Sequence, residues 1–338
     1  YNMSNLEDIL NPTVQQGTVD FIASGTLPNG APVVLKSDGT VGAIDPSVIE
    51  AMNDLSEGSS VIFADTNVQK NAVAFDPINP NKVVIVYRDN TNSGRGYAAI
   101  GTISGSAITF GTPILYSATN DTNSSSDNSI TFDPYNSGRV VITYQEGSNY
   151  TRAVVGTITG STMTFGSYTD FSQYSNEVSV AFDPNAANRF IVSFLPNSNS
   201  YGNAMVGTIL GTAITFGTPV VFASLACTAA EVVFDPDNVD RIICAFGTAT
   251  GGEAVVGTVS GTSIIFGTSA SYTSGYTSYT SISFDTNTTG NFVVAYTDYD
   301  QSDKGFVSVG TVSGTSITFG SEYEFNGNGT GRLDVDFD

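Results

Sequence analysis

The side chains that could perform acid–base or metal chemistry in this chain are almost all carboxylates. The sequence contains no histidine, two cysteines (Cys227 and Cys244) and 32 aspartate and glutamate residues. Without histidine, Ser-His-Asp and Cys-His catalysis and any zinc site with an imidazole ligand are excluded. Two cysteines are too few for a four-thiolate zinc site or a disulfide framework. Cys244 lies in an apolar run, which favours a small core residue over a disulfide with Cys227.

Three of the carboxylates, Asp298, Asp300 and Asp303, occur in one short stretch that ends at Gly305. Calcium binds several oxygen ligands in a flexible loop with a glycine turn. The third aspartate, however, is one position away from the EF-hand spacing, and no glutamate follows in the required place. The stretch is therefore only a weak calcium candidate, and no other metal and no cofactor is expected.

Paired carboxylates could also hydrolyse a glycosidic bond, which makes an enzyme the main competing class. The sequence singles out no such pair. The sialidase Asp-box, Ser-x-Asp-x-Gly-x-Thr-Trp, is absent from the chain, which contains no tryptophan. We therefore expect that the protein is not an enzyme.

The charge of the chain limits its partners. The 11 lysine and arginine residues against 32 acidic residues give a formal net charge of −21. Nucleic acids and anionic membranes are poor partners for such a chain, because like charges repel. No run of 18 apolar residues is present, so no membrane-spanning helix is expected.

Two motifs recur along the chain with one period. A hairpin motif of the type GT…TFG begins at residues 101, 156, 207, 257 and 310, at intervals of 55, 51, 50 and 53 residues. A second motif, Phe-Asp, mostly followed by proline, keeps the same period. It occurs at Phe75, Phe132, Phe182, Phe234, Phe284 and Phe337. The chain is therefore a repeat protein.

Each repeat is interpreted as four strands. The first alternates apolar residues before Phe-Asp, as at Val178, Val180 and Phe182. It ends at a turn in which the aspartate caps the backbone and proline presets φ. The second is a nearly continuous apolar run, which is typical of a strand that is covered on both faces. The GT…TFG segment supplies the last two strands, and its turn glycine is expected to need positive φ.

Four short antiparallel strands in every repeat predict an all-β fold, a β-propeller of four-stranded blades. An open β-solenoid is the alternative, but its repeats are normally shorter. Five complete repeats and a further first strand at 332–338 favour six blades, with the two chain ends closing one blade; five or seven blades stay open.

The chain divides into three parts. Residues 1–16 show no clear pattern and are expected to form an arm. Residues 17–66 contain strand segments and one short helix, with Asp45 as N-cap and Pro46 as its first residue, and are assigned to the closing blade. Residues 67–338 are the propeller repeats.

The loops in which the repeats differ are the expected binding surface. In a propeller, the loops between second and third strands and between successive blades share one face. Here these loops are rich in Tyr, Asn, Ser, Thr and Gly, which supply contact area and adaptable hydrogen bonds. The alternative is that they are solvated connections. The candidate ligand-binding residues are Tyr87, Arg88, Tyr97, Tyr150, Tyr174, Tyr201, Tyr276, Tyr279, Asp298 and Tyr299.

The repeats VGTVSGTSITFGS (309–321) and VGTILGTAITFGTPVVF (206–222), with the Phe-Asp segments, resemble repeats in structural proteins of marine and cyanobacterial tailed phages. The segment ASGTLPNGAPVVLKSDGTV (23–41) is similar to segments that precede such repeats. The resemblance covers roughly residues 20–338. It implies a virion-associated fibre, decoration or appendage component that contacts the host surface. It provides no motif-defined binding residues.

Two functions follow from this resemblance. One is a propeller that binds a host-surface receptor or glycan from the virion surface. The other is a purely structural component that docks other virion proteins through the N-terminal region. A secreted or cell-surface adhesin or lectin is a third possibility, and a homo-oligomer is compatible with each. Fold alone does not decide among them.

Overall fold

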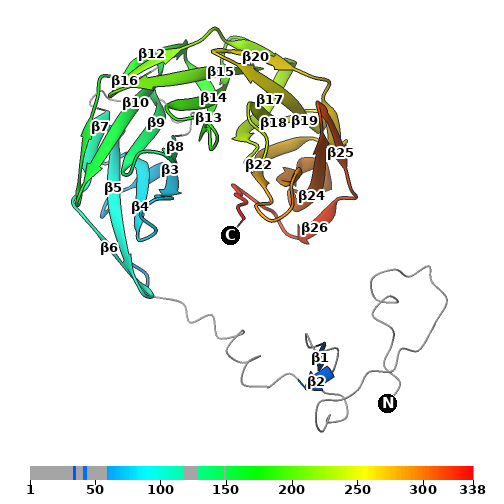
Figure 1. The fold of residues 1–338 in the computed structure, drawn as a ribbon, viewed down its shortest axis with the longest axis horizontal. Coiled ribbons are helices and arrows are strands. Elements are labelled where there is room, and N and C mark those ends of the chain that lie inside the picture. The colour runs from blue at the N-terminus through cyan, green and yellow to red at the C-terminus, as the bar shows by residue number, and fades with distance from the viewer. Residues whose placement is uncertain (1–32, 36–40, 44–58, 118–127, 148–149, 338) are drawn as a thin grey trace, which may run out of the picture. The chain divides into compact units, whose positions relative to one another are not determined.

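The computed structural model describes residues 33–35, 41–43, 59–117, 128–147 and 150–337 (Figure 1). The chain forms two compact units, residues 1–59 and 60–338. In the first unit, β1 (Val33–Leu35) pairs antiparallel with β2 (Val41–Ala43). The predicted arm and the predicted helix lie outside the described residues, so both stay predictions.

The second unit is built from five similar blades of antiparallel strands, whose first strands lie innermost (Figure 1). This architecture confirms the predicted β-propeller. The strands are β3 (Val68–Phe75), β4 (Lys82–Asp89), β5 (Arg95–Ser104), β6 (Ala107–Phe110) and β7 (Ile114–Ser117) in blade 1; β8 (Ser129–Phe132), β9 (Arg139–Glu146), β10 (Tyr150–Thr159), β11 (Thr162–Phe165) and β12 (Thr169–Gln173) in blade 2; β13 (Ser175–Phe182), β14 (Arg189–Pro196), β15 (Tyr201–Leu210) and β16 (Ala213–Phe216) in blade 3; β17 (Val220–Phe234), β18 (Arg241–Thr248), β19 (Gly251–Ser260), β20 (Ser263–Phe266) and β21 (Ala270–Thr273) in blade 4; and β22 (Thr277–Phe284), β23 (Asn291–Asp298), β24 (Lys304–Ser313), β25 (Ser316–Phe319) and β26 (Tyr323–Asn326) in blade 5.

The outermost strand of each blade is divided into two pieces that pair with the same neighbour. In blade 1, β6 pairs with the end of β5 and β7 with its start. Gly105 in the turn between β5 and β6 has φ +59°, and its four equivalents have φ between +60° and +64°, as the hairpin motif predicts. The 15-residue strand β17 serves two blades, because its first part pairs with β15 and its second part with β18.

Each interface between neighbouring blades is an apolar core that both blades supply. Between blades 3 and 4, for example, Ile191 and Val206 pack with Phe234 and Phe246. An aromatic residue on the outer strand of one blade also contacts rings of the next blade, as Phe222 contacts Phe246. Such packing explains why strands at these interfaces are apolar on both faces.

The turn after each first strand is held by the predicted aspartate cap. Asp133 accepts a hydrogen bond from the Tyr135 backbone N–H (2.8 Å) and another from Arg139 Nε (2.6 Å). Asp183 and Asp235 repeat this pattern with Arg189 and Arg241. The repeated aspartates are therefore structural caps, as expected from the sequence.

The innermost strands of successive blades are joined by one repeated hydrogen bond. In blades 2 to 5, the side chain three residues before the Phe-Asp phenylalanine accepts a bond from a backbone N–H of the next innermost strand or of segment 332–337, whereas blade 1 has Ala72 at this position. We call these side chains the rung residues. They are Ser129 (to Val180 N, 3.2 Å), Ser179 (to Val232 N, 3.4 Å), Glu231 (to Ile282 N, 2.8 Å) and Ser281 (to Val335 N, 3.2 Å).

The last of these bonds places segment 332–337 beside β22, where a sixth first strand would lie. Asp334 and Asp336 also accept hydrogen bonds from Ser281 Oγ (2.9 Å) and Ser283 Oγ (3.0 Å). At the other end of the described blades, Phe63 contacts the rings of Tyr87 and Phe110, as outer-strand aromatics do between the other blades. Neither of these two segments is a strand in the structure, although both were predicted as strands, so the shared blade stays a prediction.

Blade 1 and blade 5 each have one face that no other described blade covers, and these two faces are apolar and exposed. Phe75 in blade 1 is 60% exposed, whereas its equivalent Phe132 is 5% exposed. Val309 in blade 5 is exposed, whereas its equivalent Val256 is buried. The remaining strands of the predicted sixth blade fall in residues 17–59, mostly outside the described residues, so the blade number stays a prediction.

Deletion of residues 332–338 is expected to lower the midpoint of thermal unfolding. The segment covers Ser281 and Ser283, and its half-buried apolar residues contribute about 1–2 kcal/mol. Thermal unfolding monitored by circular dichroism would measure the change, with deletion of Asp338 alone as the control. An unchanged midpoint would exclude a role for this segment in holding the propeller together.

No helix in the described part of the chain is long and apolar enough to span a membrane.

Candidate functional site

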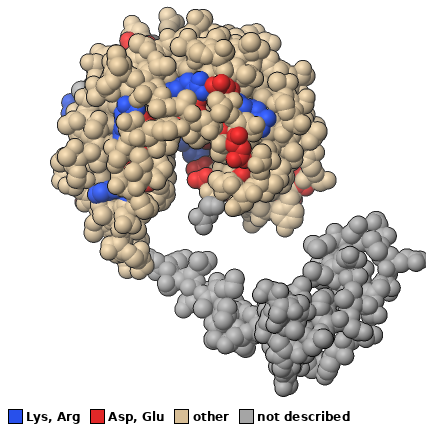
Figure 2. Space-filling model, viewed as in Figure 1, with Lys and Arg blue, Asp and Glu red and all other residues tan. Residues whose placement is uncertain are grey.

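The main cavity of the described propeller lies at its centre, between the innermost strands. Its volume is about 1040 Å³, and all five blades and segment 332–337 contribute to its wall. Hydroxyl-bearing side chains alternate with apolar ones along this wall. On the face shown in Figure 2, charged side chains gather around the central hollow, with basic and acidic groups side by side. The parts of the blades that lie farther from the hollow are largely uncharged.

Three of the predicted binding residues line the cavity near the end where the innermost strands begin. Tyr276, Tyr279 and Tyr299 all line it, with exposed fractions of 36%, 40% and 41%. The rings of Tyr276 and Tyr299 are in contact, with centroids 4.8 Å apart and planes inclined at 35°. We call these three residues the tyrosine cluster.

Two loops of blade 5 are tied together to hold the cluster. The Tyr299 N–H donates to the Tyr276 carbonyl (2.9 Å), and the Tyr276 N–H donates to Asp300 Oδ2 (2.9 Å). Asp298, 1% exposed, caps the short 3₁₀ turn Tyr299–Gln301 by accepting from the Asp300 N–H (2.9 Å). These bonds fix the backbone beneath both rings, so the rings are presented at low entropic cost.

Tyr279 is presented by a different feature, an irregularity in β22. The register of β22 against β23 shifts between Ser278 and Ser281, and Tyr279 has φ +48°. A positive φ at a bulky residue is uncommon and costs of order 1 kcal/mol or more. The bulge turns Tyr279 toward the cavity, whereas most of β22 packs within the propeller.

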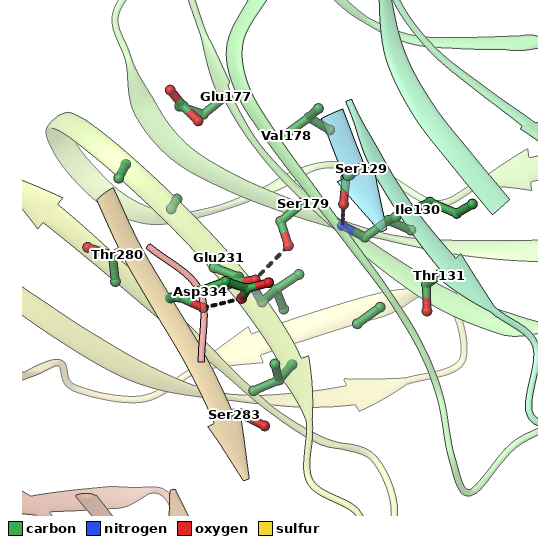
Figure 3. A pocket seen from close by; sticks show the side chains of 18 of the residues that line it. Ser129, Ile130, Thr131, Glu177, Val178, Ser179, Glu231, Thr280, Ser283 and Asp334 are labelled. Atoms are coloured by element: carbon green, nitrogen blue, oxygen red, sulfur yellow. Dashed lines mark hydrogen bonds between the residues drawn. The ribbon is translucent and has the colours of Figure 1, made fainter. Parts of the chain in front are cut away.

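Glu231 is the one rung residue that carries a carboxyl group, since the other three are serines. Figure 3 shows its carboxyl group close to Ser179 and Asp334, while Glu177 points away. Burial, followed by repulsion from Asp334, raises the pKa of Glu231 from 4.5 to about 7, despite the hydrogen bonds from Ile282 and Ser281 that favour its ionised form. A carboxyl group with this pKa changes charge around neutral pH.

The other predicted binding residues are not brought to this site. Tyr87 is 2% exposed and stacks on Tyr97 with centroids 6.0 Å apart, so it is a core residue rather than a loop contact. Burial raises its pKa to about 12. Asp298 is likewise a buried cap and does not face a ligand. Both predictions placed the end of a second strand too early, since β4 and β23 continue to Asp89 and Asp298.

The remaining candidates lie on separate blades. Arg88 lines a small cavity between blades 1 and 2. Tyr150 is exposed beside Arg152, whose guanidinium carbon lies 5.7 Å from its ring centroid. Tyr174 accepts a bond at its carbonyl from Asn197 N, and Tyr201 N donates to Asn199 Oδ1. The structure therefore supports one cluster rather than a ring of equivalent sites.

The weak calcium candidate is not assembled as a metal site. Asp298 and Asp300 direct oxygens to backbone N–H groups, and Asp298 Oδ2 also accepts from Gln301 Nε2 (3.1 Å). Across the described ranges, no group of three or more aspartate, glutamate or cysteine side chains is placed to bind a metal ion. Cys227 and Cys244 are both buried and unpaired with each other.

Glu231, Ser179, Ser281 and Asp334 were not predicted as site residues. A signal was present, because each stands three residues before a Phe-Asp phenylalanine, where every repeat except the first, which has Ala72, carries serine or an acid. Alternation assigns this position to one face of a strand, but it does not show that the side chain reaches the next blade.

No protein-family model and no curated protein sequence matches this chain. Solved structures match it at the level of fold. They include a periplasmic gluconolactonase from Pseudomonas aeruginosa (TM-score 0.54, 10% identity, 80% of this chain and 77% of that chain) and an Aleuria aurantia lectin in complex with Fucα1-6GlcNAc (0.52, 10%, 79% and 83%). Another is Chaetomium thermophilum Sqt1 bound to the N-terminus of the ribosomal protein L10 (0.52, 14%, 80% and 68%).

The chain covers 61% of a further structure of Chaetomium Sqt1. At these identities the similarity establishes the fold that the proteins share, and it assigns no function to this chain.

Proposed function

We propose that this propeller is a non-catalytic binding module that recognises a glycan at the tyrosine cluster. The observation that carries the proposal is the convergence of Tyr276, Tyr279 and Tyr299 at one end of the central cavity. A pyranose ring has one face of C–H groups, which packs on an aromatic ring, and a rim of hydroxyls, which needs hydrogen-bond partners. The exposed tyrosine rings supply the first, and the hydroxyls lining the cavity supply the second.

The similarity of the fold to a lectin in complex with a fucose-containing disaccharide and to a propeller bound to a peptide is compatible with this proposal. The exposed aromatic rings of the pocket favour binding, whereas Glu231 and Asp334, two carboxyl groups on the same wall, make hydrolysis the alternative to test. One solved propeller of this fold is a gluconolactonase, so assays for lactone and glycoside hydrolysis belong with the binding tests.

Replacing Tyr276 or Tyr299 with alanine is expected to weaken glycan binding about tenfold, equivalent to about 1.4 kcal/mol, because each ring offers exposed contact area in a pre-ordered pair. The wild-type protein would first be screened on a glycan array, and the affinity for the best ligand then measured by calorimetry. Tyr323→Ala is the control, since Tyr323 is 70% exposed but does not line the cavity. Equal affinities for all variants would rule out the tyrosine cluster as the site.

We further propose that the module belongs to the surface of a phage particle. The resemblance of its repeats to those of tailed-phage structural proteins supports this placement, and the acidic composition agrees with it. Mass spectrometry of purified particles would detect the chain if the placement is right. Pull-down against host cells and against purified virion proteins would separate receptor binding from a purely structural role. Recovery from a cellular surface in the absence of phage particles would favour an adhesin.

A further inference from the structure

Segment 332–337 is held against the cavity wall by side chains rather than by a ladder of backbone bonds. Its contacts with β22 are Val335 N to Ser281 Oγ, Ser281 Oγ to Asp334 Oδ1 and Ser283 Oγ to Asp336 Oδ1. The first strands of the five blades, in contrast, pair with a second strand of their own blade. Segment 332–337, which is not a strand in the structure, is therefore attached to β22 mainly through these polar groups.

Three carboxyl groups meet at this attachment. Asp334 and Asp336 extend from the segment toward β22, and Glu231 approaches Asp334 from β17 (Figure 3). On the described strands beside Glu231, the neighbouring side chains add no positive charge. Ser179 on β13, Ala245 on β18 and Ser281 on β22 are neutral, and Glu177 on β13 points away. Arg332, the one basic residue of the segment, lines the cavity as well.

A carboxylate is not required to form the rung at this position. Ser129, Ser179 and Ser281 accept the equivalent N–H in the other blades with an uncharged hydroxyl. Glu231 accepts from Ile282 N with one carboxyl oxygen, and this bond can persist when the other oxygen is protonated. What the glutamate adds to the rung is a charge that depends on pH.

We propose that Glu231 is a pH-dependent latch that controls the docking of segment 332–337 on the cavity wall. When Glu231 is neutral, the segment lies along β22 as the structure shows. When it is ionised, repulsion from Asp334 and Asp336 weakens the attachment, and the segment leaves the wall that it shares with the tyrosine cluster. This inference concerns the segment itself and does not depend on glycan binding.

Whether docking strengthens or weakens with rising pH follows from the direction of the pKa shift. Folding raises the pKa of Glu231 to about 7, so the folded form holds a proton that the released form gives up. Docking is therefore strongest below the unshifted pKa of 4.5 and weakens as pH rises toward 7. Above that value the weakening is complete and docking no longer changes with pH.

A single tryptophan can report docking, because the chain contains none. Phe337→Trp places the reporter on the half-buried end of the segment. In the full chain, we expect acrylamide quenching of this tryptophan to rise several-fold between pH 4.5 and pH 7 and to stay level above pH 7. The same reporter combined with Glu231→Ser should show no such transition, because serine is the residue that other blades use as the rung. Glu231→Gln provides a second neutral variant of nearly the same size.

The proposal is overturned if quenching of the wild-type background is flat over this range, or if both Glu231 variants keep its midpoint. Circular dichroism would verify that each variant is folded. If neither Glu231 variant folds, Asp336→Asn decides the matter, since removing one facing charge must move the midpoint to lower pH. An unmoved midpoint would then contradict the mechanism. Glycan affinity, measured separately, has no bearing on this result.

Discussion

Replacing Asp183 with alanine is expected to lower the free energy of unfolding by about 3–5 kcal/mol, because it removes one partner of a buried ion pair. The Asp183 side chain is fully buried. It accepts from the N–H groups of Asn185 (2.7 Å) and Ala186 (3.1 Å) and from Arg189 Nε (2.6 Å). Its loss leaves these donors without their acceptor.

The effect should extend to the next blade. Arg189 also pairs with Asp240, which belongs to the corresponding turn of blade 4. Once Asp183 is gone, the guanidinium is held by one partner only, and the link between the two turns weakens. Urea and thermal unfolding would measure the loss of stability.

Asp285→Ala is the matched control for Asp183→Ala. Asp285 has the same place in blade 5, where Asn291 replaces the arginine, and hydrogen bonds from Asn287 and Thr288 lower its pKa in a half-buried setting. Replacing Asp285 with alanine should lower the free energy of unfolding clearly less than replacing Asp183. Equal losses for the two variants would show that the cap, and not the buried ion pair, stabilises these turns.

Gly217→Ala is expected to destabilise the propeller by about 2–3 kcal/mol through steric overlap between blades 3 and 4. Gly217 follows the TFG phenylalanine of blade 3. A Cβ atom built there would overlap the backbone carbonyl oxygen of Thr262, in the hairpin turn of blade 4. Backbone cannot move aside as a flexible side chain can, so the blades would have to separate locally.

Gly320→Ala tests whether this cost arises at the blade interface. Gly320 is the same motif position in blade 5, and among the described residues a Cβ there would meet the Val309 carbonyl oxygen at 3.7 Å, an ordinary contact distance. The variant should unfold within a degree or two of the wild type. A large loss of stability at both positions would mean that the glycine is required within its own blade and not at the interface between blades.

The repeat made the fold predictable from sequence. The Phe-Asp and GT…TFG motifs recur because each blade needs the same capped turn and the same tight hairpin, and both are local features. Their period therefore indicated the strand number per blade and the propeller. The aspartate caps were predictable for the same reason.

The site was less predictable, because it depends on where strands end and on which loops meet. Tyr87 and Asp298 terminate apolar runs, and a run does not show whether pairing continues past its last apolar residue. Tyr276 and Tyr299 were both predicted in loops of one face, but their contact arises from one backbone bond and one bond to the Asp300 side chain between loops 23 residues apart in sequence. Glu231 was overlooked, since its role is defined by the neighbouring strand rather than by its own.

The continuous strand β17 has a consequence for how the molecule opens. Blades 4 and 5 are separated by a break between β21 and β22, whereas blades 3 and 4 share one uninterrupted strand. Local opening of either blade 3 or blade 4 must disturb hydrogen bonds in both. In hydrogen-exchange measurements, blades 3 and 4 should therefore open as one cooperative unit. A protease that cuts between other blades should find no cleavage site at the junction of these two.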